Sequence, residues 1–160
     1  MKFNNLLFGT AGIPLSTDDR NTVNGVARVR KLNLDAMELE FVRMVHLNEK
    51  TAVPVKETAQ KNNVVLTCHG QYYINLNSQE KAKIEASKKR VFQAAKIAYL
   101  AGAMSMTFHS AYYMHEPSEK VYPKIKSAMT EIVKQLKNEG IPIWIRPETT
   151  GKGSQFGTVD

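Results

Sequence analysis

Two kinds of hydrophobic pattern alternate along this chain. Short runs rich in Val, Ile, Leu, Phe and Met are typical of buried strands, and longer stretches with apolar residues three and four positions apart are typical of amphipathic helices. Together these patterns predict an α/β fold in which strands and helices alternate strictly. The expected strands span residues 3–10, 36–42, 64–69, 106–109 and 143–148.

Capping residues mark where the expected helices begin. Asp18, Asp19 and Asn21 can cap a first helix, and a second is expected over residues 49–62 with Pro54 inside its first turn. Asn77, followed three positions later by Glu80, is a capping-box pattern that predicts the start of a long helix ending near Gly102. A fourth helix is expected over residues 119–138, which Gly140 follows.

Strict alternation of strands and helices predicts a parallel sheet built from five βα units. The chain has 160 residues, which fits one domain. An eight-stranded barrel needs about 250 residues, so the chain is expected to supply part of such a barrel. An open, doubly wound sheet accommodates five strands equally well, and the pattern alone leaves both architectures open.

Composition and net charge indicate which binding partners and which cellular compartment to expect. The formal net charge of +7 favours a polyanionic partner such as nucleic acid, although solubility alone explains it equally well. With the single cysteine Cys68 the chain can form no internal disulfide, so a cytoplasmic location is expected. No apolar run approaches the roughly 20 residues that cross a bilayer, and the N-terminus reads as a strand rather than a signal peptide.

Three of the expected strands end in a residue that can bind a metal ion. These residues are His69, His109 and Glu148, separated by 40 and 39 positions, which is about the length of one βα unit. Because parallel strands end at one rim of a barrel, the three donors are expected to meet there. Two imidazoles and a carboxylate form a common ligand set for Zn²⁺. The simpler alternative is that each histidine is a hydrogen-bonded residue at a strand end.

Alternation within the strands predicts which side chains share the metal ligands' face. Glu38 and Glu40 lie on one face of the second strand, within possible reach of Arg146 on the fifth. A buried polar layer containing an ion pair of Arg146 with one of these carboxylates is therefore expected. Cys68 points to the other face, which argues against a nucleophilic role beside His69.

Three segments occur in an order that resembles the endonuclease IV family. They read CHGQYYINL (68–76), FHS (108–110) and PETTGKGSQFG (147–157). The resemblance implies a (β/α)8 TIM barrel of the xylose-isomerase-like superfamily, of which residues 1–160 form the N-terminal part with about the first five βα units. It also implies a zinc-dependent hydrolase that repairs double-stranded DNA by cleaving on the 5′ side of abasic sites.

The resemblance further implies roles for individual residues. His69 and His109 would bind one zinc ion, and Glu148, the expected catalytic residue, would bridge it to a second. Tyr72 and Arg43 would contact the DNA. The family's later Asp, His and Glu ligands, which complete a three-zinc cluster, follow the fifth strand. The 160-residue chain is therefore expected to bind metal weakly, to show little nuclease activity, and to self-associate through the exposed edges of its sheet.

Two alternative functions agree less well with the residues of the chain. Sugar isomerases and epimerases share this barrel, but would need Glu and Asp ligands where the chain has His69 and His109. The segment from Gly151 to Ser154 has the residue types of a phosphate-binding loop, but it lacks the Gly-x-x-x-x-Gly-Lys-Ser/Thr spacing.

Overall fold

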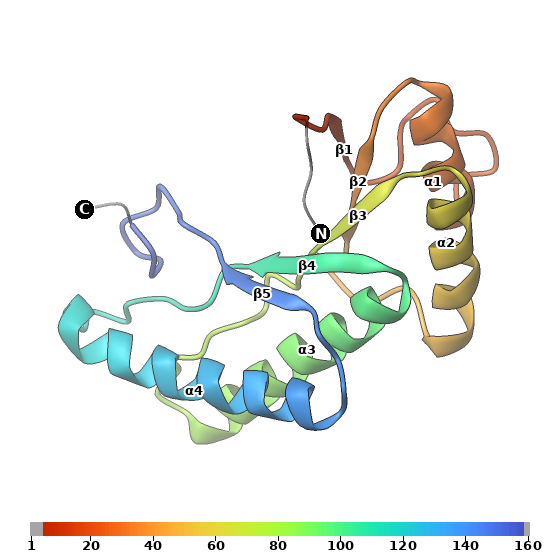
Figure 1. The fold of residues 1–160 in the computed structure, drawn as a ribbon. Coiled ribbons are helices and arrows are strands. Elements are labelled where there is room, and N and C mark those ends of the chain that lie inside the picture. Colours follow the sequence, from red (N-terminus) through yellow and green to blue (C-terminus); the bar gives the residue numbers. More distant parts are fainter. Residues whose placement is uncertain (1–4, 159–160) are drawn as a thin grey trace.

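The structure is a computed structural model that describes residues 5–158, and its strands and helices alternate as predicted (Figure 1). The strands are β1 (Gly9–Ala11), β2 (Ala36–Glu40), β3 (Val65–His69), β4 (Ala103–Phe108) and β5 (Trp144–Pro147). The helices are α1 (Thr22–Lys31), α2 (Glu49–Lys61), α3 (Lys81–Leu100) and α4 (Ser118–Asn138).

The strands form one parallel sheet in the order β1-β2-β3-β4-β5. Consecutive helices pack against one another, α1 on α2, α2 on α3 and α3 on α4, and line the outer side of the curved sheet (Figure 1). A doubly wound sheet would instead reverse its strand order and carry helices on both faces. The sheet is therefore part of a TIM barrel, which confirms the predicted fold class and rules out the open alternative.

Side chains alternate between the two faces of the sheet. On β2 and β4, Met37, Leu39 and Phe108 are at most 2% exposed on the face that packs under the helices. Glu38 and Glu40 lie on the opposite face and are only partly buried. Glu38 and Glu40 therefore share one face of β2 as predicted, but they are not fully buried. The inner face corresponds to the interior of a barrel.

One predicted helix start is confirmed and another is wrong. The helix α2 begins at Glu49 as predicted, where Asn48 caps it through a reciprocal pair of hydrogen bonds with Thr51, but Pro54 lies in its second turn and not in its first. The helix α3 begins after Glu80 and has no side-chain cap. Asn77 does not cap it, because its side chain donates to backbone carbonyls of the loop that follows β4.

The edge strands β1 and β5 each pair on one side only. The strand β1 spans three residues, shorter than the predicted segment 3–10, of which residues 3 and 4 lie outside the described part. Both edges leave backbone groups of the sheet without a neighbouring strand, as the predicted self-association requires. Self-association itself stays a prediction. Within residues 5–158, no helix is long and apolar enough to cross a membrane.

The predicted burial of Arg146 is wrong. The residue is exposed on the edge strand β5, and its guanidinium carbon lies 5.2 Å from the ring centroid of Trp144, itself 66% exposed. No ion pair joins Arg146 to Glu38 or Glu40 in the described part of the chain. Two strands separate β5 from β2 in the curved sheet, so a shared face does not bring these side chains together.

Candidate metal centre

The three sequence-predicted metal ligands meet at one end of the sheet. His69 is the last residue of β3, His109 follows β4 and Glu148 follows β5. One donor atom from each residue lies within 4.8 Å of the others. Glu148 Oε2 is 3.1 Å from His69 Nε2 and 3.6 Å from His109 Nε2. The parallel register brings these strand ends side by side, although 79 positions separate His69 from Glu148.

The hydrogen bond at His69 Nδ1, the ring nitrogen that faces away from Glu148, favours a cation in this cluster. The Gly70 carbonyl oxygen lies 2.7 Å from His69 Nδ1. A carbonyl oxygen can only accept, so Nδ1 carries the proton of the neutral ring. Nε2 then directs a lone pair at a Glu148 carboxylate oxygen. Two acceptor atoms, His69 Nε2 and Glu148 Oε2, can lie this close only with a second ring proton or a shared cation between them. A histidine whose other ring nitrogen donates to a backbone carbonyl is typical of metal ligands.

The donor set therefore fits a zinc ion. Zn²⁺ in catalytic sites binds three imidazole or carboxylate groups and keeps a further position for water or substrate. The cluster is reachable from solvent, since the side chains of His69, His109 and Glu148 are 13%, 25% and 36% exposed. His109 Nδ1 is buried and has no hydrogen-bond partner among the described residues.

Of the two predicted DNA contacts, Tyr72 lies beside the cluster. Its ring stacks on His109 with a centroid distance of 6.1 Å and meets the edge of His69 at 5.6 Å, and the residue is 50% exposed. Arg43 is exposed in the loop between β2 and α2, and among the described residues no hydrogen bond or ion pair joins it to His69, His109 or Glu148. The structure thus groups Tyr72 with the metal ligands.

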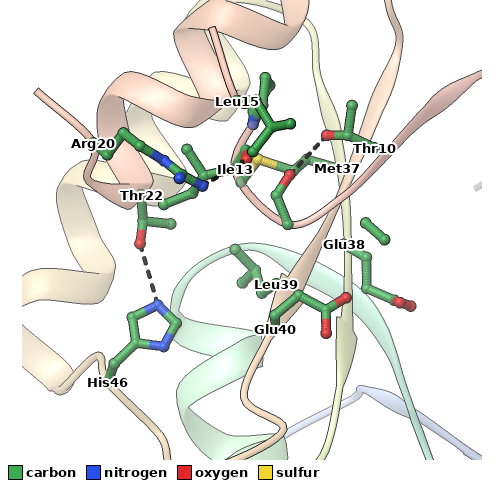
Figure 2. A pocket seen from close by; sticks show the side chains of 13 residues that line it. Thr10, Ile13, Leu15, Arg20, Thr22, Met37, Glu38, Leu39, Glu40 and His46 are labelled. Atoms are coloured by element: carbon green, nitrogen blue, oxygen red, sulfur yellow. Dashed lines mark hydrogen bonds between the residues drawn. The ribbon is translucent and has the colours of Figure 1, made fainter. Parts of the chain in front are cut away.

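A cavity of about 520 Å³ opens at the C-terminal ends of β1 and β2 (Figure 2). Glu40, one of its lining residues, is the direct strand neighbour of His69, so the cavity adjoins the candidate metal centre. Partial burial and the nearby Glu38 carboxylate raise the pKa of Glu40 above its ordinary value. A volume of this size suits a small polar ligand.

Sequence reasoning missed the residues at the start of α1 and in the nearby loops that line this cavity. Figure 2 shows the hydroxyl of Thr22 and the ring of His46 in a hydrogen bond of 3.3 Å, and Arg20 donates to the Ile13 carbonyl oxygen at 3.3 Å. His46 is exposed in the loop between β2 and α2. Its contact with Thr22 spans 24 positions, and no periodic pattern in the sequence points to it.

Cys68 is expected to resist alkylation in the folded chain. The side chain lies on the face of β3 that the helices cover and is fully buried. This burial raises the pKa of its thiol well above the ordinary value, and the Glu38 carboxylate raises it further. Iodoacetamide at about pH 8 should therefore react roughly 100-fold more slowly with the folded chain than with the chain unfolded in guanidinium chloride. Similar rates in the two states would contradict this buried placement.

The chain resembles known proteins in sequence and in fold. It is 41% identical over 155 residues to an uncharacterized protein from Methanocaldococcus jannaschii, covering 97% of this chain and 55% of the relative. The chain thus spans about half the length of the curated relative that it matches.

Several solved structures share the fold at low sequence identity. Endonuclease IV from Thermus thermophilus superimposes with a TM-score of 0.68 and 17% identity, over 92% of this chain and 54% of the other. D-psicose 3-epimerase from Clostridium cellulolyticum gives a TM-score of 0.69 and 14% identity, over 86% and 50%. Residues 26–160 match the family described as the xylose isomerase-like TIM barrel. The chain belongs to this family.

Proposed function

We propose that residues 1–160 form the N-terminal part of a single TIM-barrel domain, and that the whole protein is a zinc-dependent phosphodiesterase acting on the 5′ side of abasic sites in DNA. In this proposal His69, His109 and Glu148 hold the metal ion, and Glu148 is the catalytic carboxylate. The observation that carries the proposal is the convergence of these three side chains from consecutive strands, with donor atoms within 4.8 Å of one another.

The proposed chemistry divides between the metal ion and the chain. When bound, zinc supplies Lewis-acid polarisation of a phosphodiester near neutral pH. The chain holds its donors rigidly: the Gly70 carbonyl fixes the orientation of the His69 ring, and Glu148 N donates to the Phe108 carbonyl oxygen at 3.0 Å. This last hydrogen bond keeps the Glu148 backbone level with the end of β4, next to His109.

Duplex DNA with an abasic site is the substrate that the exposed groups support best. Tyr72 presents a half-exposed ring directly beside the cluster, and an aromatic ring can stack on or beside bases without sequence preference. The net charge of +7 favours the phosphate backbone. Arg43 belongs to the proposed DNA contacts as an exposed cation of the β2–α2 loop.

The test is incision of a duplex that contains one abasic site, by the protein carried to the natural stop of its reading frame. We expect cleavage on the 5′ side that leaves a 3′-hydroxyl, is abolished by a chelator and is restored by zinc. The same duplex with an intact nucleotide serves as the substrate control. Absence of incision in the presence of zinc would contradict the proposal.

Two neighbouring tyrosines provide a matched comparison within that assay. Tyr72→Ala is expected to lower incision about tenfold, or roughly 1.4 kcal/mol, because it removes the ring beside the cluster. Tyr73 is 64% exposed in the same loop, and Tyr73→Ala removes the same side chain. Equal losses in the two variants would argue against a specific role for Tyr72.

A sugar isomerase or epimerase is the second candidate. The cavity of about 520 Å³ beside the cluster, with the Glu38 and Glu40 carboxylates in its lining, favours a small polyhydroxylated ligand. The epimerase fold similarity is compatible with this function. Epimerisation of a ketohexose such as D-tagatose by the metal-loaded protein, together with an intact abasic duplex, would select this candidate over the nuclease.

A further inference from the structure

The loop that follows β4, residues 109–117, is hydrogen-bonded on both sides to neighbouring loops. On one side, Leu76 N in the loop after β3 donates to the Ser110 carbonyl oxygen at 3.0 Å. On the other, Phe156 N in the loop after β5 donates to the Ala111 carbonyl oxygen at 3.0 Å. A candidate metal ligand stands at the start of each of these three loops, since His69 ends β3 and His109 and Glu148 directly follow β4 and β5. Their relative positions therefore help to set the geometry of the cluster.

Asn77 adds a side-chain link between the first two of these loops. The residue is 2% exposed, and its Nδ2 donates to the carbonyl oxygens of Tyr112 at 3.0 Å and Tyr113 at 3.2 Å. Carbonyl oxygens can only accept, so the atom that faces them is the amide nitrogen and the orientation of the amide group is fixed. Asn77 thereby satisfies two consecutive carbonyls of the loop that His109 begins.

Asn75 connects the same two loops through its side-chain oxygen, which accepts hydrogen bonds where the Asn77 side chain donates them. Its Oδ1 accepts from Asn77 N at 3.1 Å and from Tyr112 N at 3.3 Å. Its own backbone N–H donates to the hydroxyl of Ser87 on α3 at 3.0 Å, which anchors the link to a helix. The loop after β4 is thus held by the side-chain nitrogen of Asn77 and the side-chain oxygen of Asn75.

We propose that Asn77 is a positioning residue for the metal centre. By fixing the backbone at Tyr112 and Tyr113, its amide holds the loop that starts at His109 against the loop that follows His69. Groups outside the ligand set that orient the ligands typically change metal affinity by 10- to 100-fold when they are replaced. This inference rests on the proposed zinc site and adds a residue that acts on the ligands without touching the ion.

The first test measures zinc affinity by competition with a coloured chelator, using as the unaltered chain the protein carried to the natural stop of its reading frame. Asn77→Ala should bind zinc at least tenfold more weakly than the unaltered chain while keeping its far-ultraviolet circular dichroism spectrum. Asn62→Ala is the matched control, because Asn62 Nδ2 donates to the Thr58 carbonyl oxygen at 2.8 Å at the end of α2, remote from the cluster. Its affinity should stay within twofold of the unaltered chain.

A pair of isosteric variants separates the role of Asn77 from a general disturbance of the loop. Asn77→Asp loses both donors and should weaken zinc binding at least as much as Asn77→Ala. Asn62→Asp makes the same chemical change at the end of α2, outside these loops, where it removes the hydrogen bond from Asn62 Nδ2 to the Thr58 carbonyl oxygen. Zinc binding by Asn62→Asp should therefore stay within twofold of that of the unaltered chain.

The outcomes distinguish the two proposals. If the unaltered chain binds zinc and Asn77→Ala binds it within twofold, the positioning role is overturned while the zinc site stands. If the unaltered chain binds no zinc, both are overturned. If the Asn77 variants do not fold, amide hydrogen exchange in the unaltered chain tests whether the loops that Asn77 joins are coupled to zinc binding. Zinc should slow exchange of the Leu76 and Tyr113 amides at least tenfold, and unchanged rates would overturn the inference.

Discussion

Glu148→Gln is expected to weaken zinc binding by the chain about 100-fold, which corresponds to about 2.7 kcal/mol. Glu148 Oε2 is the atom that both imidazole Nε2 atoms approach, at 3.1 and 3.6 Å. Glutamine keeps an oxygen of similar position but removes the negative charge, which is a large part of a carboxylate's affinity for a divalent cation. Competition with a chelator, followed by absorbance, measures the change.

The same variant should leave the metal-free chain at least as stable as before. Its side-chain amide can donate to His69 Nε2, whose lone pair otherwise faces a carboxylate oxygen. Denaturant unfolding with a chelator present measures this. Glu57→Gln, an exposed carboxylate on α2, is the control and should change neither quantity. Unchanged zinc affinity in Glu148→Gln, or a loss of stability above about 1 kcal/mol without metal, would contradict the assigned geometry.

Phe108→Ala is expected to destabilise the chain by about 3–5 kcal/mol, because truncation of a fully buried aromatic side chain leaves a cavity in the core. Phe108 is 0% exposed on β4, directly before His109, and its backbone oxygen accepts the Glu148 N–H. A Cβ atom placed on Gly70 would lie 3.1 Å from the Phe108 Cβ, so the strand end is closely packed. Urea unfolding followed by circular dichroism gives the free energy of unfolding.

Tyr122→Ala is the control for this substitution. Tyr122 is 56% exposed on α4, and its truncation should cost no more than about 0.5 kcal/mol. A similar small cost at Phe108 would mean that the end of β4 is not packed as the structure has it.

Periodicity in the sequence predicted the elements that carry the site. The strand β3 ends at His69 as expected, because a mostly apolar, β-branched run precedes it and Gly70 and Gln71 interrupt the pattern directly after it. The ends of β4 and β5 differ from prediction by one residue, and His109 and Glu148 directly follow them. Since parallel strands end at one rim, a correct order of strands was sufficient to bring the three donors together.

Contacts made by loops could not be predicted in this way. The sequence pattern of Asn77 and Glu80 is that of a capping box, but the Asn77 side chain donates across 35 and 36 positions to the loop after β4. Local pattern cannot distinguish these uses of an asparagine, because both satisfy backbone groups. The incorrect prediction that Arg146 is buried has a different cause. Alternation gives the face of a strand but not its distance from another strand of a curved sheet.

The separation of His69 and Glu148 by 79 positions makes the cluster a marker of completed folding. Local segments can form α3 or α4 early, but contacts between distant parts of a chain require the intervening loops to close first. The two imidazoles come together when β4 joins β3, and the carboxylate arrives only when β5 is in place. Any ion held by all three groups would therefore stabilise the pairing of β5 with β4 and would report, through its own binding, that this edge of the sheet has formed.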